Sequence, residues 1–288
     1  MFNNWSSAMA KRKWDVIVGN PPYQSGDEKS AVSSQLWDKF VAKAFSICKE
    51  GGYISLIHPS PWRKPESKLY DEFRNRQLKY LEIHNQQDGL KTFNCATRYD
   101  WYILKNEKGN NSKIIVKDEN EEEISINMYE WDFLPNCNYL LFDKIMAKEG
   151  EEKCEAMYSY DCDVRKPWMS KVQTKEHKYP CVTMMTKAIP ITLFWSNTKD
   201  KGHFGIPKVI INLTGATLCY LIDDKGEYGM TQWTFGIKID SKEEGEKIKE
   251  ALMSEKFEKV WKASQWLSMT REWRVFASFR KDFWKEFV

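Results

Sequence analysis

The sequence predicts an α/β domain followed by a mainly β domain that ends in helices. In the first hundred or so residues, short apolar runs alternate with amphipathic patterns, which is typical of a parallel, doubly wound sheet. Beyond about residue 160, short β-like runs are separated by Pro, Gly, Asn and Asp. A chain of 288 residues is long enough to form both cores.

The first half reads as strands and helices in alternation. "WDVIVG" (14–19) is a buried-type strand, and "SSQLWDKFVAKAFSICKEGG" (33–52) is a helix with Ser33 or Ser34 as its N-cap and two glycines at its end. "YISLIHP" (53–59), "LKYLEIH" (78–84) and "CATRYDWYILK" (95–105) are expected strands, and "PESKLYDEFRNRQ" (65–77) a second helix. Ligands bind at the carboxyl ends of the strands in such sheets, which is where residues 20–23 fall.

The second half is richer in strands. A short strand pair is expected in "KIIVKD" and "EEISIN", and a helix near "YLLFDKIMAKE". The later strands are expected in "CVTMM", "ITLFW", "KVIINL", "LCYLI" and "QWTFGIKI". A single helix is expected over 241–263, with Ser241 and Glu244 placed for a capping box.

The charge is unevenly distributed along the chain. Residues 118–163 carry 3 Lys/Arg against 14 Asp/Glu, whereas residues 164–208 carry 9 against 2 and residues 1–117 carry 19 against 12. We therefore divide the chain into an α/β domain (1–117), an acidic connector (118–160) and a second domain (161–288). An acidic stretch between two basic ones favours two polyanion-facing surfaces, with ordinary surface charge as the alternative.

Several classes of protein are disfavoured. No apolar run approaches 18 residues and no signal peptide is evident, so we expect a soluble, cytoplasmic protein without a membrane partner. The seven cysteines form no C-x-x-C pair, which predicts reduced, packed thiols. The four histidines lie far apart without metal-ligand spacing, so no metal site is expected.

The most informative segment is Asn20-Pro21-Pro22-Tyr23, at the predicted end of a strand. Two prolines make a stiff turn that keeps its carbonyl oxygens and donates no hydrogen bond. The Asn20 side-chain oxygen and the Pro21 carbonyl can accept both hydrogens of a planar NH₂ group and make its nitrogen more nucleophilic. Tyr23 offers a face on which a flat ring can stack. The alternative is a rigid polar turn.

The string "DVIVGNPPYQ" resembles the amino-methyltransferase motif of adenine-N6 DNA methyltransferases, most closely the methylase part of type IIG restriction–modification enzymes. The resemblance continues through "GGYISLIHPSPWRKP" and "LKTFNCATRYDWYILKN". It implies a partial Rossmann-like methyltransferase sheet followed by a target-recognition domain. It also implies catalytic roles for Asn20 to Tyr23, with Phe93 stacking the flipped base against Tyr23; core packing is the alternative for Phe93.

The resemblance implies S-adenosylmethionine as cofactor, but the usual cofactor half is not evident. Only 19 residues precede Asn20, too few for one βαβ unit, and no G-x-G occurs anywhere in the chain. The cofactor-binding residues are therefore unknown, with Asp15 as one candidate neighbour of that site. We expect a second subunit to carry the missing motif.

The second expected partner is double-stranded DNA, whose target base must be rotated out of the stack. Basic loops in the second domain offer phosphate-binding side chains: Arg165, Lys166, Lys171, Lys175, Lys178, Lys199 and Lys201. The leading hypothesis is an adenine-N6 DNA methyltransferase of a restriction–modification system. One alternative is an inactive DNA-binding or specificity subunit, or a decayed methylase fragment. The other is an amine methyltransferase that acts on RNA or on protein glutamine.

Overall fold

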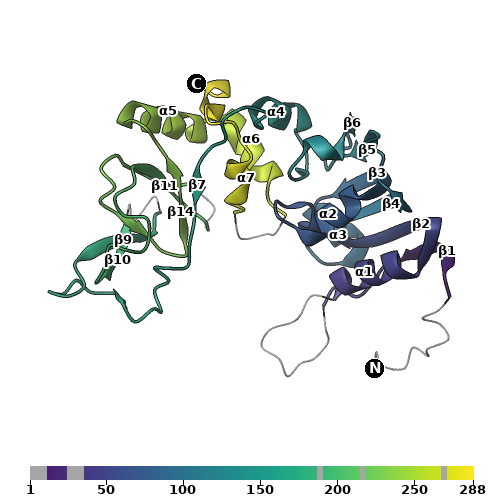
Figure 1. The fold of residues 1–288 in the computed structure, drawn as a ribbon, viewed down its shortest axis with the longest axis horizontal. Coiled ribbons are helices and arrows are strands. Elements are labelled where there is room, and N and C mark those ends of the chain that lie inside the picture. The colour runs from purple at the N-terminus through teal and green to yellow at the C-terminus, as the bar shows by residue number, and fades with distance from the viewer. Residues whose placement is uncertain (1–11, 25–35, 187–190, 215–217, 267–270) are drawn as a thin grey trace. The chain divides into compact units, whose positions relative to one another are not determined.

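The structure is a computed structural model that describes residues 12–24, 36–186, 191–214, 218–266 and 271–288 (Figure 1). The chain forms two compact units, Met1–Cys137 and Asn138–Val288. Their boundary falls inside the stretch expected to be an acidic connector, because the strand pair that follows residue 113 joins the first sheet.

The described part of the first unit is built on one six-stranded sheet, in the order β1-β2-β4-β3-β5-β6. Its strands are β1 (Trp14–Gly19), β2 (Cys48–Pro59), β3 (Arg76–His84), β4 (Tyr99–Lys108), β5 (Ile114–Lys117) and β6 (Glu123–Ile126). Its helices are α1 (Trp37–Ile47), η2 (Ser60–Arg63), α2 (Lys68–Arg74), α3 (Gln86–Phe93) and η3 (Met128–Glu130). The predicted α/β class is confirmed.

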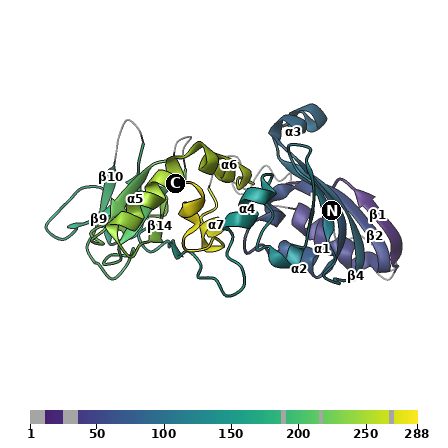
Figure 2. The same ribbon diagram turned by 90° about the horizontal axis from the view of Figure 1, so that it is seen from above.

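The expectation of an all-parallel sheet is wrong at β4. This strand lies between β2 and β3 and runs antiparallel to both. The link from β3 to β4 explains the reversal: α3 has eight residues and spans about 12 Å, whereas the nine residues of β3 span about 30 Å. A helix this short cannot carry the chain back along the sheet for a parallel return. Figure 2 shows α3 beyond the ends of the strands.

The predicted end of the first helix is also wrong. The helix α1 ends at Ile47, and Gly51 and Gly52 belong to β2. Gly51 has φ 73°, and a Cβ on Gly52 would lie 2.8 Å from the backbone oxygen of Asp15. The two glycines thus allow a bulge against β1 rather than a helix end, and the register shifts there. The predicted N-caps Ser33 and Ser34 lie outside the described residues.

The two faces of this sheet differ. One face is covered by α1 and α2, and its fully or nearly buried side chains include Ile54, Leu56, Leu81, Tyr102 and Leu104. The register places a second set of apolar side chains on the opposite face, and these are more than one-third exposed: Val16, Val18, Tyr53, Ile103 and Ile115. Within the described residues, this second face is therefore only partly covered.

The second unit contains the predicted strands, with helices at its end, and its helices are about as extensive as its strands. Its strands are β7 (Ala156–Met157), β8 (Met169–Ser170), β9 (Tyr179–Met184), β10 (Thr192–Ser196), β11 (Lys208–Asn212), β12 (Tyr220–Asp223), β13 (Gly229–Met230) and β14 (Thr234–Lys238). They form two four-stranded sheets, ordered β13-β9-β10-β8 and β12-β11-β14-β7. Its helices are α4 (Tyr139–Ile145), α5 (Lys242–Met253), α6 (Glu255–Ala263), α7 (Arg274–Ala277) and η4 (Phe283–Glu286).

The single helix expected over 241–263 is two helices. Ser254 is extended, with φ −71° and ψ 145°, and its hydroxyl accepts a hydrogen bond from the Phe257 N–H as the cap of α6. At the start of α5, Ser241 caps the Glu244 N–H as predicted. The Glu244 carboxylate, however, accepts from the Asp240 N–H at 2.7 Å.

The described residues contain neither a candidate membrane span nor a candidate metal site. Among the residues described above, no helix combines the length and apolar character needed to cross a bilayer. In the same residues, no group of three or more His, Cys, Asp or Glu side chains is placed to hold a metal ion.

Candidate active site

The carboxyl ends of β1, β2 and β3 meet at one edge of the first sheet. β1 and β2 are parallel, and β4 is antiparallel to both β2 and β3, so these three strands run in the same direction. Residues 20–23 follow β1, η2 follows β2, and α3 follows β3. The amino end of β4 comes back to the same edge. The fold thus gathers at one edge segments that are far apart in the sequence.

The tetrapeptide lies at this edge with its polar member accessible. Asn20 and Pro22 are exposed, Pro21 is buried and Tyr23 is half-buried. The Tyr23 carbonyl accepts a hydrogen bond of 3.3 Å from the Leu36 N–H, just before α1 begins. The turn is therefore fixed at Pro21 and at Tyr23, while the Asn20 side chain remains accessible to a ligand.

Phe93, at the end of α3, lies against Tyr23. The two ring centroids are 6.3 Å apart, and the rings meet edge to face with an interplanar angle of 77°. Burial, and then the neighbouring Tyr99 and Asp100, raise the pKa of Tyr23 to about 12. The Tyr23 hydroxyl is therefore neutral at physiological pH, which suits a stacking role and not that of a base. The assignment of both rings to a flipped base stays a prediction.

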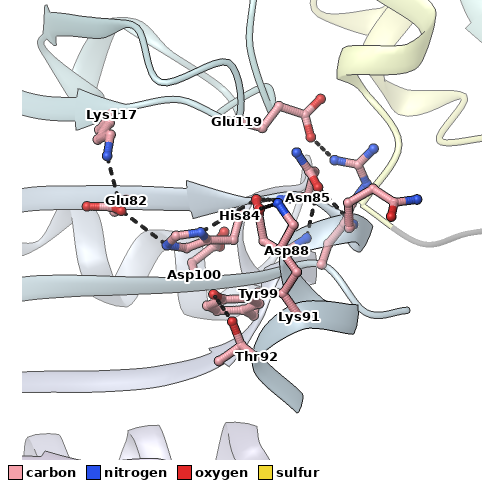
Figure 3. A network of polar contacts seen from close by, with 12 residues as sticks. Glu82, His84, Asn85, Asp88, Lys91, Thr92, Tyr99, Asp100, Lys117 and Glu119 are labelled. Atoms are coloured by element: carbon pink, nitrogen blue, oxygen red, sulfur yellow. Dashed lines mark hydrogen bonds and ion pairs between the residues drawn. The ribbon is translucent and has the colours of Figure 1, made fainter. Parts of the chain in front are cut away.

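Phe93 packs against a second pair of stacked rings, Tyr99 and His84. Its ring meets the buried Tyr99 ring edge to face, with centroids 4.9 Å apart, and Tyr99 stacks on His84 at 4.4 Å and 8°. The Tyr99 hydroxyl and Thr92 Oγ1 are 3.1 Å apart. Figure 3 shows this pair, and also His84 between the carboxylates of Glu82 and Asp88, at 3.3 and 3.7 Å. The sequence did not single out Tyr99.

The helix that carries Phe93 has well-formed ends. Asn85 accepts hydrogen bonds from the N–H groups of Gln87 and Asp88, and the Asp88 carboxylate accepts from the Asn85 N–H, which is a complete capping box. Asn94 ends the helix in the left-handed conformation, with φ 54°. These caps stabilise a helix of only eight residues and so support the position of Phe93.

A fully buried ion pair lies under the same edge. Asp100, at the start of β4, accepts hydrogen bonds from Ser60, Trp62 and Arg63 of η2, and the Arg63 Nε lies 2.8 Å from its Oδ2. The remaining Arg63 donors bond to the carbonyls of Leu134 and Pro135 and to the Asn136 side chain, at 2.9–3.0 Å. Both charges are thereby satisfied, and η2 is joined to β4.

His58, at the end of β2, predicts a pH dependence of stability. It is completely buried between Trp37, Phe73 and Tyr102, and this burial lowers its pKa to about 4. The unfolded chain binds this proton near pH 6.5, so stability falls as the pH drops from 6.5 towards 4. We expect His58 to contribute a loss of about 3 kcal/mol over this interval.

Urea unfolding of the wild type and of His58→Phe at pH 7, 5.5 and 4.5 checks this expectation. The variant removes the titrating group, so its stability should depend less on pH than that of the wild type. If the free energy of unfolding fell equally with pH in the two proteins, the pH dependence could not be assigned to His58.

The other predicted site residues lie elsewhere. Asp15 is near the amino end of β1, five positions before Asn20, and its carboxylate pairs with Lys49 at 2.7 Å. Asp15 was the single residue that the sequence offered as a neighbour of the cofactor site. None of the described strands is followed by a G-x-G turn of the kind expected at the cofactor site. The described residues alone do not fit S-adenosylmethionine. The seven predicted DNA-binding residues all lie in the second unit.

Part of the first unit is similar to a known protein family. Residues 1–94 match the family model of the Eco57I restriction-modification methylase. The resemblance inferred from the sequence is confirmed over this segment. An adenine-specific methylase of Mycoplasma pneumoniae, itself uncharacterised, is 29% identical over 85 residues, which cover 28% of this chain and 19% of that protein. The chain therefore spans about a fifth of that relative's length.

Solved structures resemble more of the chain at lower identity. The type IIL restriction-modification enzyme MmeI, solved in complex with DNA, is 11% identical, with a TM-score of 0.48 over 91% of this chain and 45% of that one. The type ISP restriction-modification enzyme LlaGI, solved with a DNA substrate mimic, is 10% identical, with a TM-score of 0.44 over 92% and 34% of the two chains.

Proposed function

We propose that this chain is the catalytic-loop and target-recognition part of an adenine-N6 DNA methyltransferase of a restriction–modification system. The observation that carries the proposal is the placement of Asn20 to Tyr23. This stiff turn follows β1 at the edge where the strand ends meet, with Asn20 exposed and Tyr23 next to Phe93. The family match of residues 1–94 supports it.

The turn supplies two acceptors for one amine. The Asn20 side-chain oxygen and the Pro21 carbonyl accept the two hydrogens of the target NH₂ group, which lessens the delocalisation of its lone pair into the ring. Such preorganised acceptors stabilise the charge that develops on the nitrogen during attack. Because proline has no N–H, neither Pro21 nor Pro22 competes for the amine as a donor.

The two aromatic rings supply the rest of the base site. A base stacked between them needs parallel rings about 7 Å apart, since stacked carbon atoms approach to about 3.5 Å. The observed separation of 6.3 Å is close to this value, but the angle of 77° is not. One ring must therefore turn when the base enters, and Phe93 is the better held of the two because Tyr99 packs behind it.

We further propose that a second subunit supplies most of the S-adenosylmethionine site and docks on β1 and the partly covered sheet face. The cofactor supplies the methyl group. Among the described strands, β1 pairs only with β2, and its Val16 and Val18 are 59% and 73% exposed. The sheet of an α/β domain is normally covered on both faces. Exposed apolar side chains on the same face of β1, β2, β4 and β5 fit a partner that completes the sheet.

The test is transfer of a radioactive methyl group from S-adenosylmethionine to mixed-sequence duplex DNA. We expect activity when the chain is combined with the product of the adjacent upstream reading frame, and little activity with either alone. Val18→Asp should abolish the combined activity by preventing docking, whereas Leu140→Asp, at another exposed apolar side chain, should not. DNA binding without transfer in any combination would instead indicate an inert specificity subunit.

A further inference from the structure

The second unit carries a cluster of lysines seated on two aromatic rings, which we call the ring-seated lysines: Lys166, Lys178, Lys199 and Lys201. We propose that these four side chains form the surface that contacts the phosphates of duplex DNA, and that Trp168 and Tyr179 position them and do not stack on bases. This inference rests on the proposed function for the identity of the nucleic acid.

The first observation is the pairing of each ring with two ammonium groups. Lys166 and Lys201 place their Nζ atoms 5.7 and 4.9 Å from the centre of the Trp168 ring. Lys178 and Lys199 lie 5.3 and 5.2 Å from the centre of the Tyr179 ring. A cation over an aromatic face is attracted by the ring's quadrupole, so these flexible side chains are partly ordered before any ligand arrives. The ring faces they cover are not available to a base.

The second observation is that the two rings belong to one surface. Trp168 packs against the small core cluster Cys162, Met169 and Cys181, and Tyr179 contacts Phe204, which packs on the same cluster. The strand pairing also places the two rings near each other, because Tyr179 pairs with Ser196 of β10, and Ser196 pairs with Met169 of β8, the neighbour of Trp168. The loop that follows β10 supplies Lys199 to one ring and Lys201 to the other.

The third observation concerns charge. None of the ring-seated lysines forms an ion pair with a described residue, although Asp161 and Asp200 are close in the sequence. Arg165, also predicted to bind DNA, is different: it pairs with Asp163 through two hydrogen bonds, of 2.8 and 2.6 Å. Like charges gathered on one surface bind a polyanion with release of counterions. The lysines are therefore better placed than Arg165 for phosphate contact.

The mode of contact follows from the chemistry of lysine. An ammonium group on a flexible stem is a point charge that suits a phosphate oxygen, whereas base reading in the major groove favours planar, bidentate side chains. Phosphate contacts fix the register of a protein on the duplex and are independent of sequence. The ring-seated lysines should thus contribute affinity and salt dependence, with sequence reading left to other groups of the second unit.

A matched pair of variants tests the proposal by fluorescence anisotropy with labelled duplex DNA, without cofactor, at several salt concentrations. Lys166→Gln with Lys201→Gln removes the charges around Trp168. Lys247→Gln with Lys285→Gln removes the same number around Trp284, where the Nζ atoms lie 4.9 and 5.6 Å from the ring centre. We expect the slope of log Kd against log salt to fall by about 2 in the first variant only.

The remaining outcomes are also decisive. Lys178→Gln with Lys199→Gln should give a similar fall, and Lys166→Arg with Lys201→Arg should keep the slope because it keeps the charges. An unchanged slope in the Gln pair, an equal fall in the Trp284 control, or loss of binding by a folded Arg variant would each overturn the proposal. The anisotropy assay measures DNA binding and not methyl transfer, so the two proposals can fail separately. A changed slope here, combined with no methyl transfer in the test of the proposed function, would uphold this surface and refute the proposed function.

Discussion

Replacing Arg63 by Met is expected to destabilise the first unit by about 3–5 kcal/mol, because it leaves the buried Asp100 carboxylate without its charged partner. Both side chains are completely buried, and Arg63 holds Asp100 through two of its nitrogen atoms. The Asp100 oxygens would keep only the donors Ser60 and Trp62. The measurement is urea unfolding of the full chain, followed by circular dichroism.

Two comparisons separate the ion pair from ordinary truncation. Arg74→Gln removes an exposed pair with Asp71 on α2 and should cost less than about 1 kcal/mol. The double variant Arg63→Met with Asp100→Asn should cost clearly less than the sum of the single changes, because no uncompensated charge remains buried. Additive effects would show that the two residues contribute independently.

The pairing of Arg63 with Asp100 could not be predicted from the sequence. Asp100 stands in the apolar strand "YDWYIL" and Arg63 in the turn "SPWR", 37 positions earlier. A charge inside an apolar strand is a signal that it needs a partner, but nothing local identifies which one. The same holds for Tyr99, whose contacts with Phe93 and His84 depend on how β3, α3 and β4 meet.

Features set by local chemistry were predictable. The prolines placed Asn20 at a strand end, glycine and polar turns separated the strands of the second unit, and Ser241 capped its helix. Strand direction was not predictable, since alternation of helices and strands does not reveal that α3 is too short for a parallel crossover. The break at Ser254 had a local signal, a serine followed by glutamate, that an uninterrupted apolar pattern concealed.

Replacing Asn20 by Ala is expected to lower methyl transfer by about 100- to 1,000-fold in the assembled enzyme, the usual cost of removing one preorganised polar group from a transition state. Asn20 is exposed and follows the end of β1, so its loss should not disturb the core. Binding of duplex DNA should change little, because the side chain engages only the flipped amine. The measurement is single-turnover transfer with saturating DNA, together with anisotropy for binding.

The neighbouring Gln24→Ala provides the control, since Gln24 is also exposed but lies outside the tetrapeptide. It should keep transfer within about threefold, less than 1 kcal/mol of transition-state free energy. If Asn20→Ala transferred methyl groups as well as Gln24→Ala does, the amine would find its acceptors elsewhere, and the turn would be only a rigid connection between β1 and α1. If both transfer and binding were lost, Asn20 would support the turn itself. Only selective loss of transfer assigns the Asn20 oxygen to the reacting nitrogen.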